Sequence, residues 1–346
     1  MSERAIHFGV LIGGLALAAW AFTRPTPDAS TSATALSAPP SLAPAVSPLS
    51  IIPPGSAFVL SADLAALERA PLGALFAQRL GQLGQANELA TLCGFDPLTR
   101  LSQLALAVPS AGMPGTNAER VDDFAVVASG PFSAAEITRC AAAAIAKRGG
   151  EAVDSKLGGF SSVRDRKGSG GEVAAKNGLL IVSGGSYFRA LLDSAEGNAP
   201  KSERDDPRDA RHAELRRALG PGELVATWLL ADGWFQRVSG DDDARLSPLG
   251  ALKALGARVQ VSTEVRLTVL LDCADADGAT QIQSLLTELR ASLGALGLAP
   301  TLAELAQRVA LTAAGSRLQL TLTLSPSELN ALFDALFSDK TQPGKR

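Results

Sequence analysis

Beyond residue 56 the chain alternates between short apolar runs and longer runs with helical spacing. The short runs are bounded by Gly, Pro or Asn and predict strands. They fall at 57–62, 103–108, 123–129, 151–155, 160–165, 172–176, 179–183, 223–231, 257–262, 265–273, 309–313 and 317–323. Capping residues and helical spacing predict helices from residue 63 and at 133–148, 187–195, 210–219, 276–297, 301–307 and 326–337. Because tight turns such as Asn177-Gly178 join neighbouring strands, we expect an α+β fold of mostly antiparallel strands with helices packed on one face.

Two parts of the chain follow similar patterns. Residues 57–67 (AFVLSADLAAL) and 224–235 (LVATWLLADGWF) each give a strand, then Ala-Asp, then a predicted helix. Residues 122–137 and 264–282 each run from a strand into a capped helix. We therefore predict an internal duplication of two α+β halves. The predicted domains are halves at 56–196 and 222–338, a polar linker with a short helix at 197–221, and a disordered tail at 339–346.

The first 55 residues differ from the rest. Residues 6–22 carry no charge and are apolar apart from His7. A helix of that length spans about 25 Å, close to the roughly 30 Å core of a bilayer. Residues 23–55 are rich in Pro, Ser, Thr and Ala, which disfavours helices and central strands. We predict a short cytoplasmic N-terminus at 1–5, a transmembrane anchor at 6–22 and a disordered linker at 23–55.

This anchor determines the predicted location. Arg4 before the apolar segment favours a cytoplasmic N-terminus, which places the C-terminal domain in the periplasm or outside the cell. Ala19-Trp20-Ala21 is typical of a signal-peptide cleavage site, so removal of the segment remains an alternative. We favour an uncleaved, single-pass protein of the inner membrane.

Composition excludes some partners. The net charge is −3 and no basic block occurs, which argues against nucleic acid. Aromatic residues make up only 5 % of the chain, which argues against a carbohydrate-binding platform. Three cysteines, Cys93, Cys140 and Cys273, lie far apart without a CxxC motif, so neither a zinc site nor a redox dithiol is indicated. One disulfide with one free thiol remains open, but we favour three small buried residues.

Residues suited to catalysis are scarce. The two histidines are His7, in the apolar segment, and His212, in a charged helix that we predict to be exposed. No G-x-S-x-G motif accompanies His212, so a Ser-His-Asp site is not indicated. Paired carboxylates for acid–base chemistry carry no sequence signature.

Some acidic and glycine-rich segments resemble known binding motifs but do not match them fully. Asp272, Asp275, Asp277 and Gly278 resemble part of a calcium loop, but the twelfth position would be Ser284. We interpret these aspartates as helix caps. Asp241 to Asp243 are interpreted as a solvated turn, with a weak cation site as the alternative. The glycines at 168–171 and 184–185 are interpreted as tight connections without P-loop spacing. We predict no catalytic, cofactor-binding or metal-binding residue.

One family resemblance rests on a short motif. After the linker, Pro54, Ala57, Val59 and Asp63-Leu64 open the first predicted strand, and Gly94 to Leu98 (GFDPL) precede a later one. This arrangement resembles a loose group of uncharacterised bacterial envelope proteins with an N-terminal anchor or signal and a Pro/Ala/Ser-rich tether. The resemblance could cover residues 53–338 and implies no activity.

Three hypotheses of function follow. The one that we favour is a membrane-tethered, non-enzymatic binding or scaffold domain with a protein or envelope-component partner. The second is a lipid- or small-ligand-binding envelope module with an apolar pocket between helices and sheet. The third is a hydrolase that uses carboxylates alone and needs two of them converging in a cleft.

Overall fold

A single twelve-stranded sheet forms the body of the protein. The computed structural model describes residues 46–75, 86–95, 100–109, 124–168, 171–185, 187–198, 206–239, 244–292 and 300–337. Its strands are β1 (Ser56–Asp63), β2 (Gln103–Pro109), β3 (Ala125–Ser129), β4 (Ala152–Leu157), β5 (Phe160–Asp165), β6 (Glu172–Lys176), β7 (Leu179–Ser183), β8 (Leu224–Leu229), β9 (Leu252–Val261), β10 (Val265–Cys273), β11 (Ala310–Ala314) and β12 (Arg317–Leu324). Their order is β11-β12-β10-β9-β8-β1-β2-β3-β7-β6-β5-β4, and every neighbouring pair is antiparallel. The antiparallel α+β fold is therefore confirmed.

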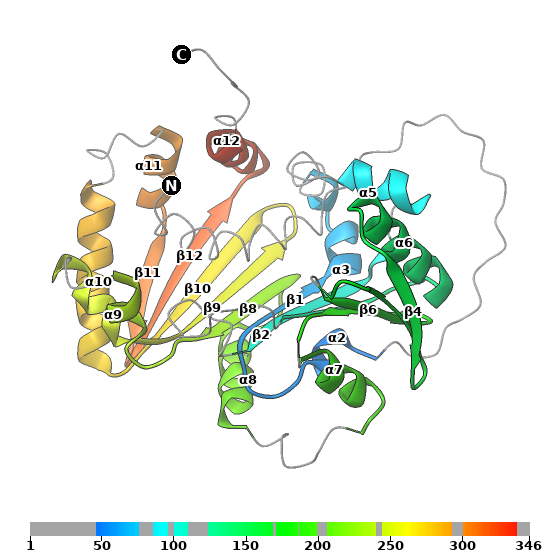
Figure 1. Cartoon of the computed structure of the whole chain (residues 1–346). Helices are drawn as coiled ribbons and strands as arrows, with labels where there is room; N and C mark the ends of the chain where they lie inside the picture. The colour runs from blue at the N-terminus through cyan, green and yellow to red at the C-terminus, as the bar shows by residue number, and fades with distance from the viewer. Residues whose placement is uncertain are drawn as a thin grey trace, which may run out of the picture.

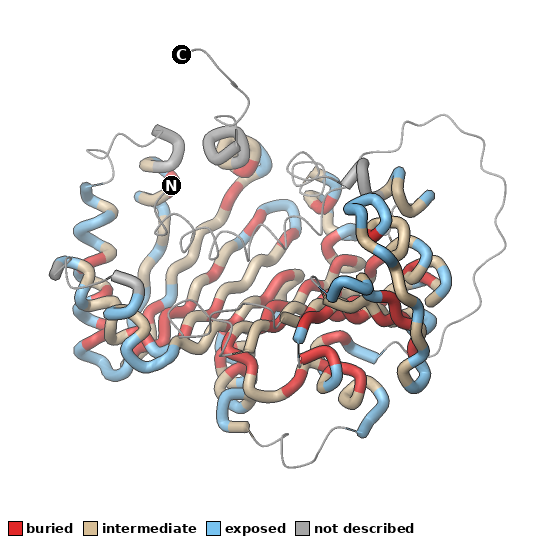
Figure 2. The backbone as a smooth tube through the Cα atoms, in the orientation of Figure 1, coloured by how far each residue is buried: buried red, intermediate tan, exposed pale blue. Residues whose placement is uncertain are grey.

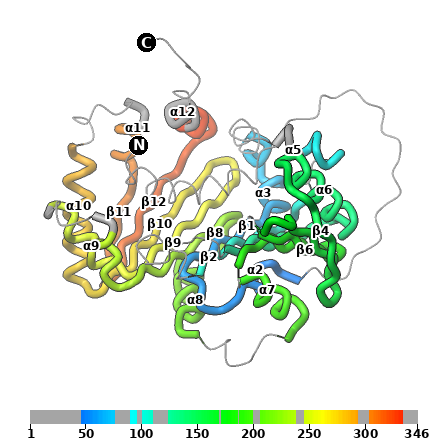
Figure 3. The backbone as a smooth tube through the Cα atoms, viewed as in Figure 1, coloured from blue at the N-terminus to red at the C-terminus, as the bar shows by residue number. Residues whose placement is uncertain are grey.

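The two predicted halves meet at the centre of this sheet, where β1 pairs with β8 (Figures 1 and 3). Outward from β1 the order is β2, β3, β7, β6, and outward from β8 it is β9, β10, β12, β11. The corresponding strands thus occupy the same places in each half, which supports the predicted duplication. The first half carries an additional hairpin, β5 and β4, at its outer edge.

Helices cover both faces of the sheet (Figure 1). They are α2 (Pro48–Ile51), α3 (Leu64–Arg69), α5 (Ala86–Cys93), α6 (Ala134–Lys147), α7 (Tyr187–Ala195), α8 (Pro207–Leu219), α9 (Trp234–Ser239), the 3-10 helix η4 (Ala244–Ala251), α10 (Ala276–Ser292), α11 (Pro300–Gln307) and α12 (Pro326–Phe337). In β7, Ile181 belongs to the core under α7, whereas its neighbour Leu180 packs in the core that includes Ile137 of α6. Successive strand residues point to opposite faces, so α6 and α7 lie on opposite sides.

The prediction of helices on one face is therefore wrong. Its physical reason is visible in β3, where Ala125, Val127 and Ala128 are all buried. Apolar residues on both faces of a strand indicate cover on both sides. Figure 2 shows this buried zone along the middle strands, with exposed positions on the outer helices and turns.

Two predicted linkers are partly folded. Residues 48–51 form α2, and Ile51, only 1 % exposed, packs in the core with Val59 and Leu191, so the linker predicted to reach residue 55 is too long. Residues 207–219 form α8, whose Leu215 and Leu219 are buried in a core that also contains Val225 and Leu270. The region predicted as a polar boundary therefore supplies a core helix.

Local capping follows the sequence closely. Ser133 and Glu136 form a capping box at the start of α6, and hydrogen bonds with the Ser133 backbone N–H and hydroxyl lower the pKa of Glu136. Ser325 and Glu328 repeat the arrangement at α12. The bounds of β5, β6, β7, α7 and α12 are those predicted.

The predicted anchor at 6–22 lies outside the described residues, as do residues 1–5 and 339–346. Within the described ranges, no helix is long and apolar enough to cross a bilayer.

Candidate ligand-binding groove

His212 is buried, which corrects the prediction that its helix face is exposed. It is 5 % exposed, on the same face of α8 as Leu215 and Leu219. Its Nε2 lies 2.9 Å from the carbonyl oxygen of Ser56, and its Nδ1 lies 2.7 Å from Thr227 Oγ1. Because a carbonyl only accepts, Nε2 carries the proton and Nδ1 accepts from Thr227 in the neutral ring. Burial lowers the pKa of His212, so the neutral form is favoured.

The polar contacts around His212 join the halves rather than form a catalytic triad. The Ser56 hydroxyl contacts the phenol of Tyr187, not the imidazole, and also donates to the Pro53 carbonyl over 3.1 Å. Arg216, one turn further along α8, donates to Ser61 Oγ over 2.8 Å. Burial lowers the pKa of Arg216 to about 10. His212 and Arg216 thus hold α8 against β1, whereas the Ser56 hydroxyl links β1 to α7.

Asp272 is not a helix cap, contrary to the prediction. It is 1 % exposed and forms ion pairs with Arg211 of α8 and Arg317 of β12. Glu214 completes a ring by pairing with the same two arginines, and Arg317 is the main cause of its lowered pKa. Two carboxylates therefore converge here, but both are neutralised by arginine.

The remaining acidic candidates have local roles. Asp275 caps α10 by accepting from the Gly278 backbone N–H over 2.7 Å, as predicted. Asp277 lies exposed in the first turn of the same helix. Within the described part of the chain, no group of His, Cys, Asp and Glu is arranged to hold a metal ion. Asp241 to Asp243 lie outside the described residues.

One carboxylate pair at the start of α8 has pKa values shifted in opposite directions. The guanidinium of Arg208 lowers the pKa of Asp206, whereas burial raises that of Asp209. Opposed shifts are typical of acid–base pairs. Here, however, Asp206 caps α8 by accepting from the Arg208 backbone N–H, and Asp209 accepts from the backbone N–H of Gly55 over 3.2 Å. Both carboxylates therefore have structural partners.

Cys93 and Cys140 form a disulfide that joins α5 to α6, which corrects the preference for three free cysteines. Cys273 is free and buried, and burial raises the pKa of its thiol, so it is poorly suited to nucleophilic chemistry. The glycines near the predicted connections behave as turns: Gly168, Gly171 and Gly185 have positive φ.

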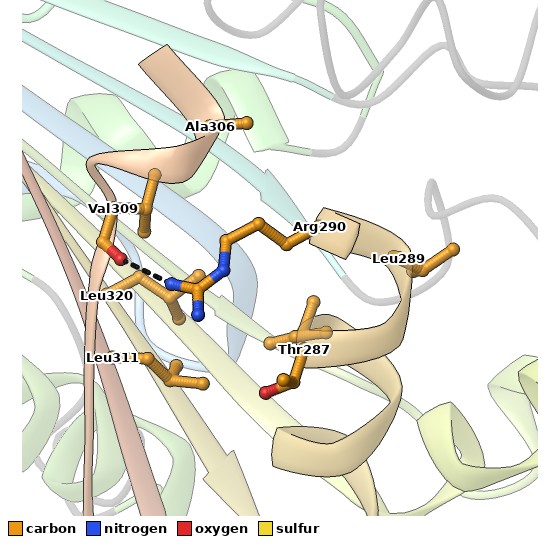
Figure 4. Close-up of a pocket in the computed structure, with 8 residues that line it drawn as sticks. Thr287, Leu289, Arg290, Ala306, Val309, Leu311 and Leu320 are labelled. Carbon is orange, nitrogen blue, oxygen red and sulfur yellow. Dashed lines mark hydrogen bonds between the residues drawn. The ribbon is translucent and has the colours of Figure 1, made fainter. Parts of the chain in front are cut away.

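An apolar groove lies between α10, α11 and the outer strands of the second half (Figure 4). Its volume is about 180 Å³. The lining is almost entirely carbon and consists of Leu286, Thr287, Leu289, Arg290, Ala306, Val309, Leu311 and Leu320. Leu289 is 39 % exposed, an unusual exposure for a large apolar side chain among the described residues. The groove is thus a candidate binding site between helices and sheet.

Arg290 provides the charge in this groove. Its guanidinium projects from α10 toward Val309, Leu311 and Leu320, as Figure 4 shows. Nη1 donates to the Val309 carbonyl over 3.2 Å. No carboxylate pairs with it among the residues that the structure describes, whereas Arg308 nearby pairs with Glu328. The groove therefore combines apolar walls with a cation.

The residues that line this groove could not be predicted from the sequence, because they come from three separate segments. A partial signal is present in α10, where Leu286, Leu289 and Arg290 are spaced three and four residues apart and so share a helix face. Nothing in the sequence shows that this face meets Leu311 and Leu320.

Comparison with known proteins gives little further information. No family model matches the chain, and no curated protein matches it. Among solved structures, one described as "Structure of crystal form I of TP0453" is similar, with 14 % sequence identity and a TM-score of 0.45. The match covers 84 % of this chain and 98 % of that chain.

Proposed function

We propose that this chain is a membrane-tethered, extracytoplasmic binding protein that holds an apolar ligand in the groove beneath α10. Residues 6–22 serve as its anchor in the inner membrane, and the chain performs no catalysis. The groove carries the proposal because it is concave, almost entirely apolar and lies between helices and sheet. Binding sites for small ligands are typically apolar concavities with few polar groups.

The disulfide supports the proposed location. The Cys93–Cys140 bond links two helices through cysteines that are 47 residues apart in the sequence. Disulfides persist in the periplasm and outside the cell, and are rare where thiols are kept reduced. An extracytoplasmic domain behind an N-terminal anchor satisfies this requirement.

The state of the acidic groups argues for binding rather than hydrolysis. A general acid at neutral pH needs a raised pKa and an unoccupied carboxyl group. Asp272 and Glu214 are held by Arg211 and Arg317, and Asp206 and Asp209 hold backbone amides. The four acids therefore already have stabilising partners.

Two variants, each with an alanine replaced by phenylalanine, test the proposed function. Ala306 lines the groove, so Ala306→Phe would fill it, whereas Ala314→Phe adds the same ring at an exposed position of β11 outside the lining. Full-length protein would be purified in mild detergent, and bound small molecules would be extracted and quantified by mass spectrometry. We expect wild type and Ala314→Phe to retain an apolar molecule and Ala306→Phe to retain at most a tenth as much. Equal loads in all three proteins would contradict the proposal.

A second candidate function is the binding of a protein partner through the sheet edge. The outer strand β11 contains no charge and no proline, and Thr312, Ala313 and Ala314 are exposed. The opposite edge, β4, exposes Asp154 and Lys156, which are charged residues of the kind that protect sheet edges. An extended segment of a partner would pair with β11, and Thr312→Lys would abolish co-purification of that partner.

A further inference from the structure

We infer that the groove beneath α10 selects a single acyl chain with an anionic head group, which Arg290 binds. This inference rests on the proposed function and adds the chemical class of the ligand. It depends on three properties of the groove: its size, the composition of its walls and an arginine that pairs with no carboxylate among the described residues.

The size of the groove favours one chain rather than two. Its volume of about 180 Å³ is close to that of an engineered apolar cavity of about 150 Å³ that binds benzene. Pockets that enclose whole drug-sized ligands are larger, at about 300–1,000 Å³. The groove therefore matches part of one acyl chain in size. The exposed side chain of Leu289 extends the apolar surface at the rim.

The position of Arg290 specifies the other end of the ligand. Its guanidinium has five N–H donors, and its described hydrogen bond, from Nη1 to the Val309 carbonyl, uses one of them. The remaining donors suit the two oxygens of a carboxylate or a phosphate, which arginine binds in a bidentate manner. Because no carboxylate pairs with Arg290 among the described side chains, an anionic ligand would supply the missing counter-charge.

The apolar walls explain why this charge contributes to selectivity. Leu311 and Leu320 lie beside the guanidinium (Figure 4), so an acyl chain bound against them would displace water from around the charge. Electrostatic attraction is stronger where water is excluded. A neutral amphiphile of the same length would keep the contacts of its chain but leave Arg290 without a partner.

Site-specific photocrosslinking on full-length protein in lipid nanodiscs tests the inference. The probe is a palmitic acid analogue with a diazirine in its chain, and crosslinked peptides are mapped by mass spectrometry. Unlabelled palmitic acid, hexadecanol and a single-chain lysophospholipid serve as competitors. We expect crosslinks on α10, β11 or β12, and competition by both anionic amphiphiles at concentrations at least tenfold below that of hexadecanol. The stronger of the two anionic competitors identifies the source of the head group.

Matched variants separate the head group from the chain. Arg290→Gln should weaken competition by palmitic acid about tenfold or more, the factor for a lost charge-assisted hydrogen bond, and leave hexadecanol unchanged. Arg290→Lys should retain part of the preference. Arg266→Gln is the control, because Arg266 is exposed on β10 and does not line the groove. Circular dichroism and thermal unfolding would verify that each variant is folded.

Two results would overturn the inference in different ways. If Arg290→Gln leaves the preference for the anionic competitors unchanged, or if wild type has no such preference, Arg290 does not select the head group. In that case, loss of crosslinking in Ala306→Phe would still support the proposed function. If Ala306→Phe crosslinks as well as wild type, both the inference and the proposed function are wrong.

Discussion

His212 Nε2 donates a hydrogen bond to the carbonyl oxygen of Ser56 over 2.9 Å, and this contact joins α8, which lies between the two halves in the sequence, to β1. The ring lies between that carbonyl and Thr227 of β8, so one imidazole contacts both central strands. His212, which we predicted to be exposed and not catalytic, is therefore a buried structural link between the two central strands.

This link predicts a pH-dependent stability. Burial lowers the pKa of His212 below the value of about 6.5 expected in the unfolded chain. The unfolded state then binds more protons than the folded state between the two pKa values, so stability rises with pH in that window. We expect full stability above about pH 6.5 and a progressive loss as the pH falls below it. Urea denaturation of the full-length chain between pH 5 and 8 would measure this slope.

The control for this prediction is His212→Gln, whose amide can still donate to Ser56 and accept from Thr227. We expect it to cost about 1–2 kcal/mol at pH 8 and to flatten the slope below pH 6.5. His7 is the other histidine of the chain, so the comparison is repeated in a His7→Gln background. An equally steep slope in the His212→Gln protein would exclude His212 as its origin.

Asp272 and Glu214 predict unequal effects of two similar substitutions. Asp272 is buried between Arg211 and Arg317, whereas Glu214 pairs with the same arginines at a site that is 41 % exposed. Asp272→Asn removes the buried negative charge, so Arg211 and Arg317 both lose the buried carboxylate that they contact. Asp272→Asn should therefore cost about 2–4 kcal/mol, and Glu214→Gln should cost clearly less, because water screens an exposed ion pair. Denaturation midpoints at pH 7 would compare them, and equal losses would show that burial of Asp272 is not decisive.

The disulfide predicts how many cysteines react with a thiol reagent before and after reduction. Denatured protein from an oxidising compartment should react with a thiol reagent at Cys273 alone, and at three cysteines after reduction. Replacing Cys93 and Cys140 together by alanine should lower the free energy of unfolding by about 2–4 kcal/mol, because the open chain gains entropy when unfolded. Cys273→Ala keeps the bond and serves as the control. Three reactive thiols before reduction would contradict the pairing.

Gly256 predicts a packing limit between α8 and the sheet. A Cβ atom at this position would lie 2.8 Å from Leu219 Cδ1, closer than carbon atoms normally approach. Leu219 is buried, so it has little room to move. Gly256→Ala should cost about 1–2 kcal/mol. In a Leu219→Ala background that cost should disappear, and a double-mutant cycle would measure the coupling. If Gly256→Ala lowered the free energy of unfolding by the same amount in that background, the loss would arise within β9 and not from contact with Leu219.

The sequence predicted those parts of the fold that depend on neighbouring residues. Asn177-Gly178 and the alternation on either side of it fix β6, β7 and their turn, and Ser325 with Glu328 fixes the start of α12. These signals act within a few residues, so no tertiary context is needed to recognise them. The antiparallel character of the sheet follows from the same turns.

The parts that the sequence did not predict depend on contacts between distant residues. His212 shares its helix face with Leu215 and Leu219, and this spacing is typical of a buried face. The many charged residues in the same helix led us to predict that it was exposed. Cys93 and Cys140 meet only because α5 packs against α6. The groove likewise brings Arg290 and Leu320 together from different segments, and no local pattern specifies that meeting.

The register between β1 and β8 has a consequence for symmetry. Aligning the Ala-Asp pair that ends each predicted strand matches Phe58 with Thr227 and Val59 with Trp228. The structure places Phe58 opposite Trp228 and Val59 opposite Thr227. A rotation of 180° that exchanged the halves would convert one of these pairs into the other. The pairing of β1 with β8 thus has the isologous geometry of a homodimer interface, in which two equivalent subunits present the same edge to each other. In this protein a single chain supplies both of the paired edges, β1 and β8.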